Sequence, residues 1–302
     1  MAYNELIIFS KKNELIQGIF GQCLIWLLEL LYFLETSNII NEHTKIIFNI
    51  NTLNNDNLIP NFILPKKLYT LNQFSKPGKI SLVQAKKRFG FGFEFNKNSF
   101  KKANNIFHKY FKFHDLIINE VYKLNINTKT LGIHYRGTDK NYDSLQANYI
   151  TQDETLAIIQ DYGKNNKIEK IFCCSDEQSF INKIKLLFPN KLIEYKQIRA
   201  NHSNNYGFFR EGHTSPKNIK NNLTLSCIID MYALSKCNTI IKTSSALSSF
   251  SKLINTSLNL YTVSAMKLPW FPAGVAEPYK TNSAIIKSIL ERTMKGDALQ
   301  NK

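Results

Sequence analysis

The stretch with the clearest chemical potential runs from Leu131 to Lys140 and reads L-G-I-H-Y-R-G-T-D-K. Its apolar residues are followed by His134 and Arg136, and then by a polar turn that begins at Gly137. Such a run predicts a buried parallel strand whose polar tip lies at the carboxyl edge of a sheet, where open α/β sheets bind ligands. The guanidinium of Arg136 offers a fork of donors that suits a phosphate or pyrophosphate. In the alternative interpretation, Arg136 pairs with Asp139 in a structural turn.

Other motifs, present or absent, indicate which groups would neutralise the charge of a bound phosphate. The chain contains no D-x-D, no H-E-x-x-H and no G-x-S-x-G motif, so we expect neither a metal-bridged diphosphate site nor a hydrolase nucleophile. Without a metal ion, phosphate must be bound by basic side chains, hydroxyls and helix N-termini. The residues placed to do so are Arg136, Thr138, Lys140, Thr243, Ser244 and Ser245.

Alternating strand and helix patterns would position these residues. Strands are expected at 5–10, 44–49, 130–135, 170–174, 192–195, 239–242 and 258–263. Helices are expected at 14–35, 99–124, 220–236 and 245–255, and from residues 151, 175 and 282 onward. The segments T-Q-D-E at 151–154 and S-D-E-Q at 175–178 both have the form of a capping box. This alternation predicts an α/β protein with mostly parallel, doubly wound sheets.

Residues 50–98 form the part of the chain with the weakest pattern. Several prolines and glycines interrupt them, so we expect irregular structure there. Within them, R-F-G-F-G-F-E-F at 88–95 is either a platform for stacking an acceptor sugar or an edge strand that covers a core. The polar stretch 125–128 is the best candidate linker, which predicts domains at 1–128 and 129–302.

Composition narrows the class of protein. A chain of 302 residues with 43% hydrophobic content can build a proper core. The five cysteines are odd in number and lack C-x-x-C spacing, and no signal peptide is apparent at the start, so a reduced, cytoplasmic protein is expected. The net charge of +16 favours an anionic membrane surface, an anionic glycolipid or nucleic acid, or else reflects solvated lysine-rich faces. No nucleic-acid-binding motif accompanies this charge, so no specific nucleic-acid partner is expected.

The segment H-Y-R-G-T-D-K at 134–140 resembles the H-x-R-R-T-D-K motif of the α1,6-fucosyltransferases. These enzymes share a superfamily with the α1,2- and protein O-fucosyltransferases. The segment I-D-M-Y-A-L-S-K-C at 229–237, with T-S-S at 243–245, is similar to the family's D-x-x-x-L-S block and the T-x-S that follows it. The segment G-I-F-G-Q-C-L at 18–24 is similar to its N-terminal glycine loop, with Gly18 and Gly21 as the glycines.

The resemblance implies a GT-B fold, in which two Rossmann-like domains face a cleft. It implies an inverting glycosyltransferase that needs no metal or other cofactor and uses a GDP-sugar donor, with fucose as the sugar. By position, Arg136 would clamp the β-phosphate, Asp230 would accept hydrogen bonds from guanine, and Ser245 with Thr243 and Ser244 would hold phosphate. His134 would orient the arginine or touch the donor, Lys140 would add charge, and Asp176 matches an acidic residue of the family.

The chain departs from the family motif at Gly137, which replaces the second arginine. This change either weakens diphosphate binding or leaves Lys140, Lys242 or Arg210 to bind the diphosphate in place of the arginine. The family's glutamate after the motif falls at Ser144, so we expect Asp143, or else Asp139, to act as the catalytic base. Either carboxylate is alternatively a solvated loop residue.

The sequence therefore predicts transfer of fucose to a glycan or glycolipid acceptor, in the synthesis of a bacterial surface polysaccharide or glycolipid. Other GDP-linked sugars, such as a heptose or deoxyheptose, would fit the same site. A polyanion-binding protein and a relative without donor chemistry are the alternatives. Peripheral contact with the inner face of an anionic membrane is a further hypothesis, and failure to bind anionic liposomes at any salt concentration would remove it.

Overall fold

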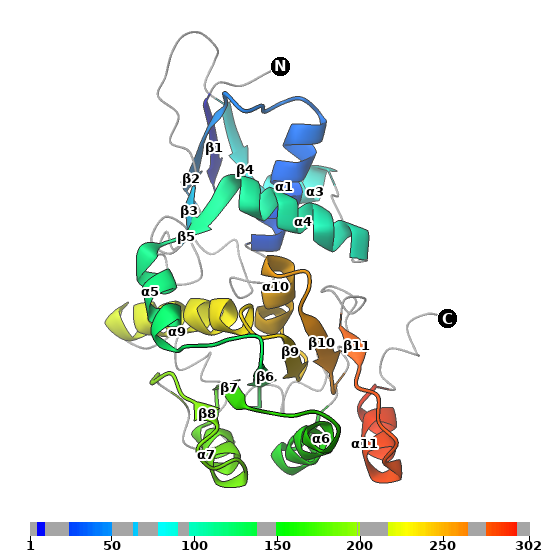
Figure 1. Cartoon of the computed structure of the whole chain (residues 1–302). Helices are drawn as coiled ribbons and strands as arrows, with labels where there is room; N and C mark the ends of the chain where they lie inside the picture. The colour runs from blue at the N-terminus through cyan, green and yellow to red at the C-terminus, as the bar shows by residue number, and fades with distance from the viewer. Residues whose placement is uncertain are drawn as a thin grey trace. The chain divides into compact units, whose positions relative to one another are not determined.

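The structure is a computed structural model, and the residues that it describes are 5–9, 24–49, 63–65, 78–89, 97–137, 149–197, 199, 217–264 and 276–294. The chain divides into two compact units, Met1–Asn119 and Glu120–Lys302 (Figure 1). The division falls inside helix α5 (Asp115–Lys123), a few residues before the linker expected at 125–128.

The first unit is built on a parallel sheet of three strands in the order β2–β1–β4. The strands are β1 (Glu5–Phe9), β2 (Lys45–Asn49) and β4 (Gly78–Ser81). Its helices are α1 (Leu24–Thr36), α3 (Leu82–Phe89) and α4 (Lys97–Tyr110), and β3 (Ile63–Pro65) pairs antiparallel with β5 (Phe111–Phe113). Leu6 and Ile8 of β1 are fully buried, because alternate residues of the strand face the core.

Two predictions for this unit are wrong. The single helix expected at 99–124 is interrupted by β5, whose Phe111 and Phe113 are buried and pair with β3. Residues 50–98 are not irregular throughout, since β3, β4 and α3 lie among them. Residues 90–95 of the aromatic and glycine segment lie outside the described part of the chain, so neither interpretation of that segment is tested.

The second unit contains a parallel sheet of six strands in the order β11–β10–β9–β6–β7–β8. The strands are β6 (Thr130–Tyr135), β7 (Lys170–Ser175), β8 (Leu192–Ile193), β9 (Thr239–Lys242), β10 (Asn259–Thr262) and β11 (Glu277–Pro278). The helices are α6 (Gln152–Asn165), α7 (Gln178–Leu187), α9 (Lys217–Leu234), α10 (Ala246–Ile254) and α11 (Ala284–Met294). The predicted α/β class, with parallel sheets in both units, is confirmed. That the two units face a cleft stays a prediction.

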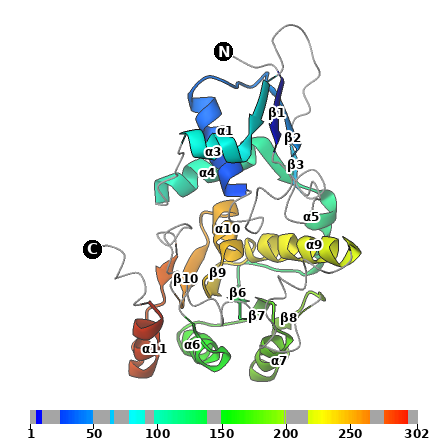
Figure 2. The same ribbon diagram turned by 180° about the vertical axis from the view of Figure 1, so that it is seen from behind.

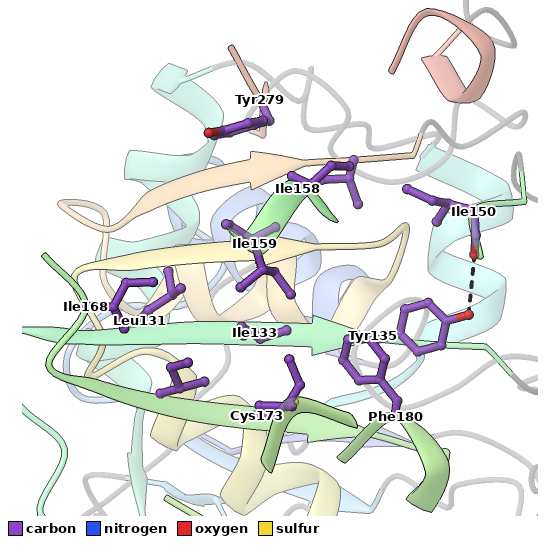
Figure 3. Packing of buried hydrophobic residues seen from close by; sticks show 14 of the residues in the cluster. Leu131, Ile133, Tyr135, Ile150, Ile158, Ile159, Ile168, Cys173, Phe180 and Tyr279 are labelled. Carbon is purple, nitrogen blue, oxygen red and sulfur yellow. Dashed lines mark hydrogen bonds between the residues drawn. The ribbon is translucent and has the colours of Figure 1, made fainter. Parts of the chain in front are cut away.

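Helices cover both faces of this six-stranded sheet (Figures 1 and 2). Helices α6, α7 and α11 lie on one face, where their apolar residues pack with Leu131, Ile133 and Tyr135 of β6. The ring of Tyr135 stacks on Phe180, with 4.3 Å between centroids, and its hydroxyl donates to the Ile150 carbonyl at 3.3 Å (Figure 3). Helices α9 and α10 lie on the opposite face. Alternation along β6 therefore turns His134 toward α9 and α10.

The order of the strands creates a switch point between β6 and β9. From β6 the chain proceeds to β7 and β8 on one side, then returns to place β9, β10 and β11 on the other. In open parallel sheets, ligands bind outside the carboxyl ends of the strands at such a point. Here the residues that follow the two strands are Arg136 and Thr243. The fold thus brings the central motif and the T-S-S segment to the edge where a ligand is expected.

The two predicted capping boxes have different outcomes. Thr151 and Glu154 form the reciprocal bonds of a capping box at the start of α6, as predicted. The box expected at Ser175 is wrong, because Ser175 is still in β7 and the N-cap of α7 is Glu177, whose side chain makes no capping bond. Instead, the Ser175 hydroxyl accepts a hydrogen bond from the Glu177 amide at 3.1 Å. Within the described residues, no helix is long and apolar enough to cross a membrane.

Candidate functional site

The tips of β6, β7 and β9 are joined by hydrogen bonds at the switch point. The Arg136 amide donates to the Thr243 hydroxyl at 2.9 Å, and the Thr243 amide donates to the His134 carbonyl at 2.9 Å. The Gly137 amide donates to a carboxylate oxygen of Asp176 at 3.0 Å. These bonds fix the backbone from which the Arg136 side chain departs, which is the preorganisation that an anion site requires.

Two basic residues lie side by side on the face of the sheet that α10 covers. His134 and Lys242 are partners in the β6–β9 ladder. The Nδ1 atom of His134 lies 2.8 Å from the Ser248 hydroxyl, and Nζ of Lys242 donates to the Ser249 hydroxyl at 3.0 Å. Burial, with the charges of Lys242 and Arg136, lowers the pKa of His134 to about 3, so its imidazole is neutral at physiological pH.

The N-terminus of α10 has the features of an anion site. Ser245 is its N-cap residue, yet the Ser245 side chain makes no capping hydrogen bond. The hydroxyl oxygen of Ser244 is buried and has no hydrogen-bond partner, although the Ser244 amide donates to the Ser264 hydroxyl at 2.9 Å. Uncapped amides at the positive end of a helix dipole bind phosphate well. Buried polar groups normally have partners, so Ser244 is an independent sign of a ligand at this end.

The loop after β6 is packed against a buried carboxylate. Glu177 is 1% exposed, and its Oε2 accepts a hydrogen bond from Gln152. The Oε1 atom of Glu177 has no hydrogen-bond partner. It occupies the space that a side chain at Gly137 would need, because a Cβ atom on residue 137 would lie 2.3 Å from this Oε1 and 2.7 Å from Cε1 of Tyr135. Burial raises the pKa of Glu177, and the charge of Asp176 adds to this. A side chain at position 137 would therefore require Glu177 or Tyr135 to move.

Asp230 lies on α9, beside the end of β7. Its carboxylate accepts a hydrogen bond from Gln197 at 2.9 Å and one from the Cys174 thiol. The positive charge of Arg199 acts on it, and Nε of Arg199 is buried without a partner. Although Gln197 and Arg199 lower its pKa, burial raises the pKa of Asp230 to about 6. A buried carboxylate with a perturbed pKa near a sheet edge is typical of a functional site.

Replacing Asp230 with asparagine is expected to stabilise the protein at pH 8. A carboxyl whose pKa is raised from 3.8 to about 6 favours the folded state when it is protonated, so stability is lost as the pH rises from about 4 to about 6. The loss is about 2–3 kcal/mol for a shift of this size. Because asparagine carries no charge, the variant should have a higher Tm than wild type at pH 8 and a similar Tm at pH 4. Equal Tm values at both pH values would contradict this account of Asp230.

The predicted site residues that the structure describes come together at one edge of the sheet. These residues are His134, Arg136, Asp176, Lys242, Thr243, Ser244 and Ser245, with Asp230 on the helix that covers the same face. The other candidates, Gly18, Gly21, Thr138, Asp139, Lys140, Asp143 and Arg210, lie outside the described residues. No sequence pattern selected Glu177, Gln197 or Arg199 as site residues, and the only signal for Glu177 was its place after the Ser-Asp tip of β7.

The groups at this edge of the sheet differ in whether they suit a metal ion or a phosphate. In the described part of the chain, no three histidine, cysteine, aspartate or glutamate side chains gather closely enough to hold a metal ion. The described groups suited to phosphate are the side chains of Arg136 and Lys242, the hydroxyls that follow β9, and the amides at the start of α10.

Comparisons with known proteins place the chain near solved fucosyltransferases at low similarity. No protein-family model matches the chain. No curated protein matches it. The crystal structure of NodZ α1,6-fucosyltransferase soaked with GDP-fucose is 14% identical, with a TM-score of 0.46 over 83% of this chain and 92% of that one.

Two other solved structures are similar at the same level. Fucosyltransferase NodZ from Bradyrhizobium is 14% identical, with a TM-score of 0.47 over 84% of this chain and 93% of that one. The apo form of POFUT1 is 10% identical, with a TM-score of 0.43 over 84% of this chain and 95% of that one. A likeness of this size decides nothing about the donor, the acceptor or the reaction of this chain.

Proposed function

We propose that the protein is an inverting glycosyltransferase that takes a sugar from a GDP-sugar donor, with fucose as the expected sugar. The observation that carries the proposal is the arrangement at the switch point. There, Arg136 of the H-Y-R-G-T-D-K motif stands beside the uncapped N-terminus of α10 and the unpartnered hydroxyl of Ser244. An arginine and a helix N-terminus at the same edge of a sheet suit the diphosphate of a nucleotide sugar.

The chemistry of this proposal is a single displacement at the anomeric carbon of the sugar. The acceptor hydroxyl oxygen forms the new bond to that carbon, and the bond from the carbon to the β-phosphate oxygen breaks and leaves its electron pair on GDP. The charge that develops on the phosphate is stabilised by Arg136 and by the α10 amides. The acceptor proton passes to a carboxylate, for which we propose Asp143, or else Asp139. The proposed acceptor is a glycan or glycolipid.

We propose that the carboxylate of Asp230 provides selectivity for guanine. The N1 and N2 atoms of guanine donate hydrogen bonds, and a carboxylate can accept both. Asp230 now accepts from Gln197 and Cys174, so a bound base would take over contacts that these side chains make. Because adenine and uracil lack this pair of adjacent donors, they should bind less well.

The experiment that tests the proposed function is thermal unfolding with GDP, UDP, CMP and ADP in parallel, followed by an assay of GDP release from GDP-fucose. A ligand at about 100 times its Kd adds about 2.7 kcal/mol of stability, which should raise Tm by several degrees with GDP alone. Preference for another nucleotide would contradict the GDP donor. GDP binding combined with turnover of another GDP-sugar, such as a GDP-heptose, would correct the sugar. Absence of a shift with every nucleotide would contradict the donor site as a whole.

A further inference from the structure

The side chain of Lys242 carries a buried amine that has no role in the mechanism proposed above. Lys242 is the last residue of β9 and directly precedes Thr243, whose hydroxyl holds the Arg136 amide. Its side chain is directed toward α10, where Nζ donates to the Ser249 hydroxyl at 3.0 Å. The Ser249 hydroxyl in turn donates to the Ser245 carbonyl at 3.1 Å, so Nζ lies within one turn of the helix start. Two hydrogen bonds thus connect the amine to the N-cap residue of α10, where the candidate phosphate site lies.

The surroundings of Lys242 do not neutralise a positive charge. The residue is 5% exposed, and no carboxylate among the described residues forms an ion pair with it. Buried ammonium groups are normally paired, because an isolated charge is costly to desolvate. Burial accordingly lowers the pKa of Lys242 to about 7. At pH 8 the free protein therefore holds this amine mostly in the neutral form.

The titratable groups that face Lys242 from neighbouring elements offer no compensation. On β6 these are His134, which is neutral, and Arg136, which is positive. On β10 the ladder partner is Thr262, whose hydroxyl donates to the Ser264 carbonyl. On α10 the facing groups are the uncharged serines 248 and 249. On α9, which packs against α10, the carboxylate of Asp230 is held by Gln197 and Cys174.

We propose that Lys242 is a second cation of the donor-phosphate site, and that it takes up a proton as the anionic donor binds. This inference rests on the proposed function, because it adds a binding residue to the same site. An anion at the start of α10 supplies the negative charge that the described surroundings of Lys242 lack. In this way the lysine replaces part of the charge that the family motif obtains from the arginine at the position of Gly137.

A dependence of donor affinity on pH follows from this coupling. An anion near an ammonium group favours the charged form and raises its pKa, by about 1–3 for a close pair. Below pH 7 the amine is already protonated and affinity should be nearly constant. Above pH 7 the Lys242 amine must take up a proton whenever the donor binds, so the affinity for the donor should fall by up to about tenfold per pH unit. A sugar diphosphate is a suitable ligand for the measurement because, unlike free GDP, it carries no phosphate monoester that titrates near pH 6.

The test is an NMR titration of the Lys242 amine in the full chain labelled with ¹³Cε-lysine, with the resonance assigned from Lys242→Met. The pKa is measured without ligand, with GDP-fucose, and with sulfate, an anion that does not titrate in this range. Lys236, which is exposed between α9 and β9, is the internal control, and its resonance should respond to neither ligand. We expect Lys242 to titrate near pH 7 in the free protein and at least one pH unit higher with GDP-fucose.

The possible outcomes distinguish a failure of the role proposed for Lys242 from a failure of the proposed GDP-sugar donor. A response to sulfate without a response to GDP-fucose would support an anion site at Lys242 and contradict the GDP-sugar donor. Binding of GDP-fucose, detected by shifts elsewhere in the spectrum, without a change at Lys242 would overturn the role of the lysine and leave the proposed function standing. A free-protein titration near pH 10 would also overturn it, because the amine would then be charged before any ligand binds.

Discussion

Replacing Arg136 with alanine is expected to remove nucleotide-dependent stabilisation and to lower kcat/KM by about 10²–10³-fold, the size of effect seen when one donor to a developing oxyanion is lost. The Arg136 amide donates to the Thr243 hydroxyl, and the Arg136 side chain takes no part in that contact. The alanine variant should therefore keep the loop in place and lose only the guanidinium. The measurements are the Tm shift with GDP and the rate of GDP release from GDP-fucose.

Arg292→Ala is the matched control for this prediction. Arg292 lies on α11, where its exposed guanidinium pairs with Glu154, and exposed pairs contribute little to stability. The control should keep both the GDP shift and the activity of wild type. A full GDP shift in Arg136→Ala would place the diphosphate elsewhere and would contradict the site proposed at the switch point.

Introducing the second arginine of the H-x-R-R-T-D-K motif by Gly137→Arg is expected to destabilise the protein and to abolish its response to GDP. Any Cβ at this position would approach Oε1 of Glu177 to 2.3 Å and Cε1 of Tyr135 to 2.7 Å. Tyr135 is 1% exposed and stacked on Phe180, so it has little room to move. Overpacking of this kind costs about 1–3 kcal/mol, and we expect a lower Tm together with loss of the GDP shift. Gly137→Ala, which adds the Cβ alone, should show the same direction.

A second substitution identifies the cause of that damage. Glu177→Ala removes the carboxylate whose Oε1 occupies the contested space, while the contact with Tyr135 remains. In the double variant with Gly137→Ala, part of the lost stability should return, so the two effects should not add. Gln178→Ala, at the next position of α7, is the control and should give no such recovery. Strictly additive losses for residues 137 and 177 would refute the steric explanation.

Sequence patterns predicted the second unit better than the first. Strands β6, β7, β9 and β10 are short apolar runs bounded by turns, a pattern that has few alternatives in an alternating α/β chain. Strand β4 was missed because its four residues, G-K-I-S, carry no apolar run and gain their pairing from β1. The helix expected at 99–124 was broken by Phe111–Phe113, where pairing with β3 outweighed helical periodicity. Long-range pairing of this kind leaves no local signal.

The candidate site was predictable in its residue types but not in its environment. Arg136 and the T-S-S segment were selected because polar residues follow apolar strands. The strand order that makes their edge the switch point appears only in the folded sheet. The position of Glu177 against Gly137 depends on side-chain packing, and so does the burial of Lys242 beneath α10. Spacing in the sequence contains neither kind of information.

The measurement that tests the central claim most directly is hydrogen exchange of the backbone amides with and without GDP-fucose. The account predicts slower exchange at the start of α10, from Ser245 to Ser248, because bound phosphate would accept from or shield these amides. It also predicts slower exchange at Arg136 and Gly137, because bound phosphate would shield their existing hydrogen bonds from solvent. Exchange in β8, which lies at the edge of the sheet beyond β7, should not change. Arg136→Ala should lose the protection. Protection by GDP-fucose that spares the start of α10 and the tip of β6 would contradict a diphosphate site at this edge of the sheet.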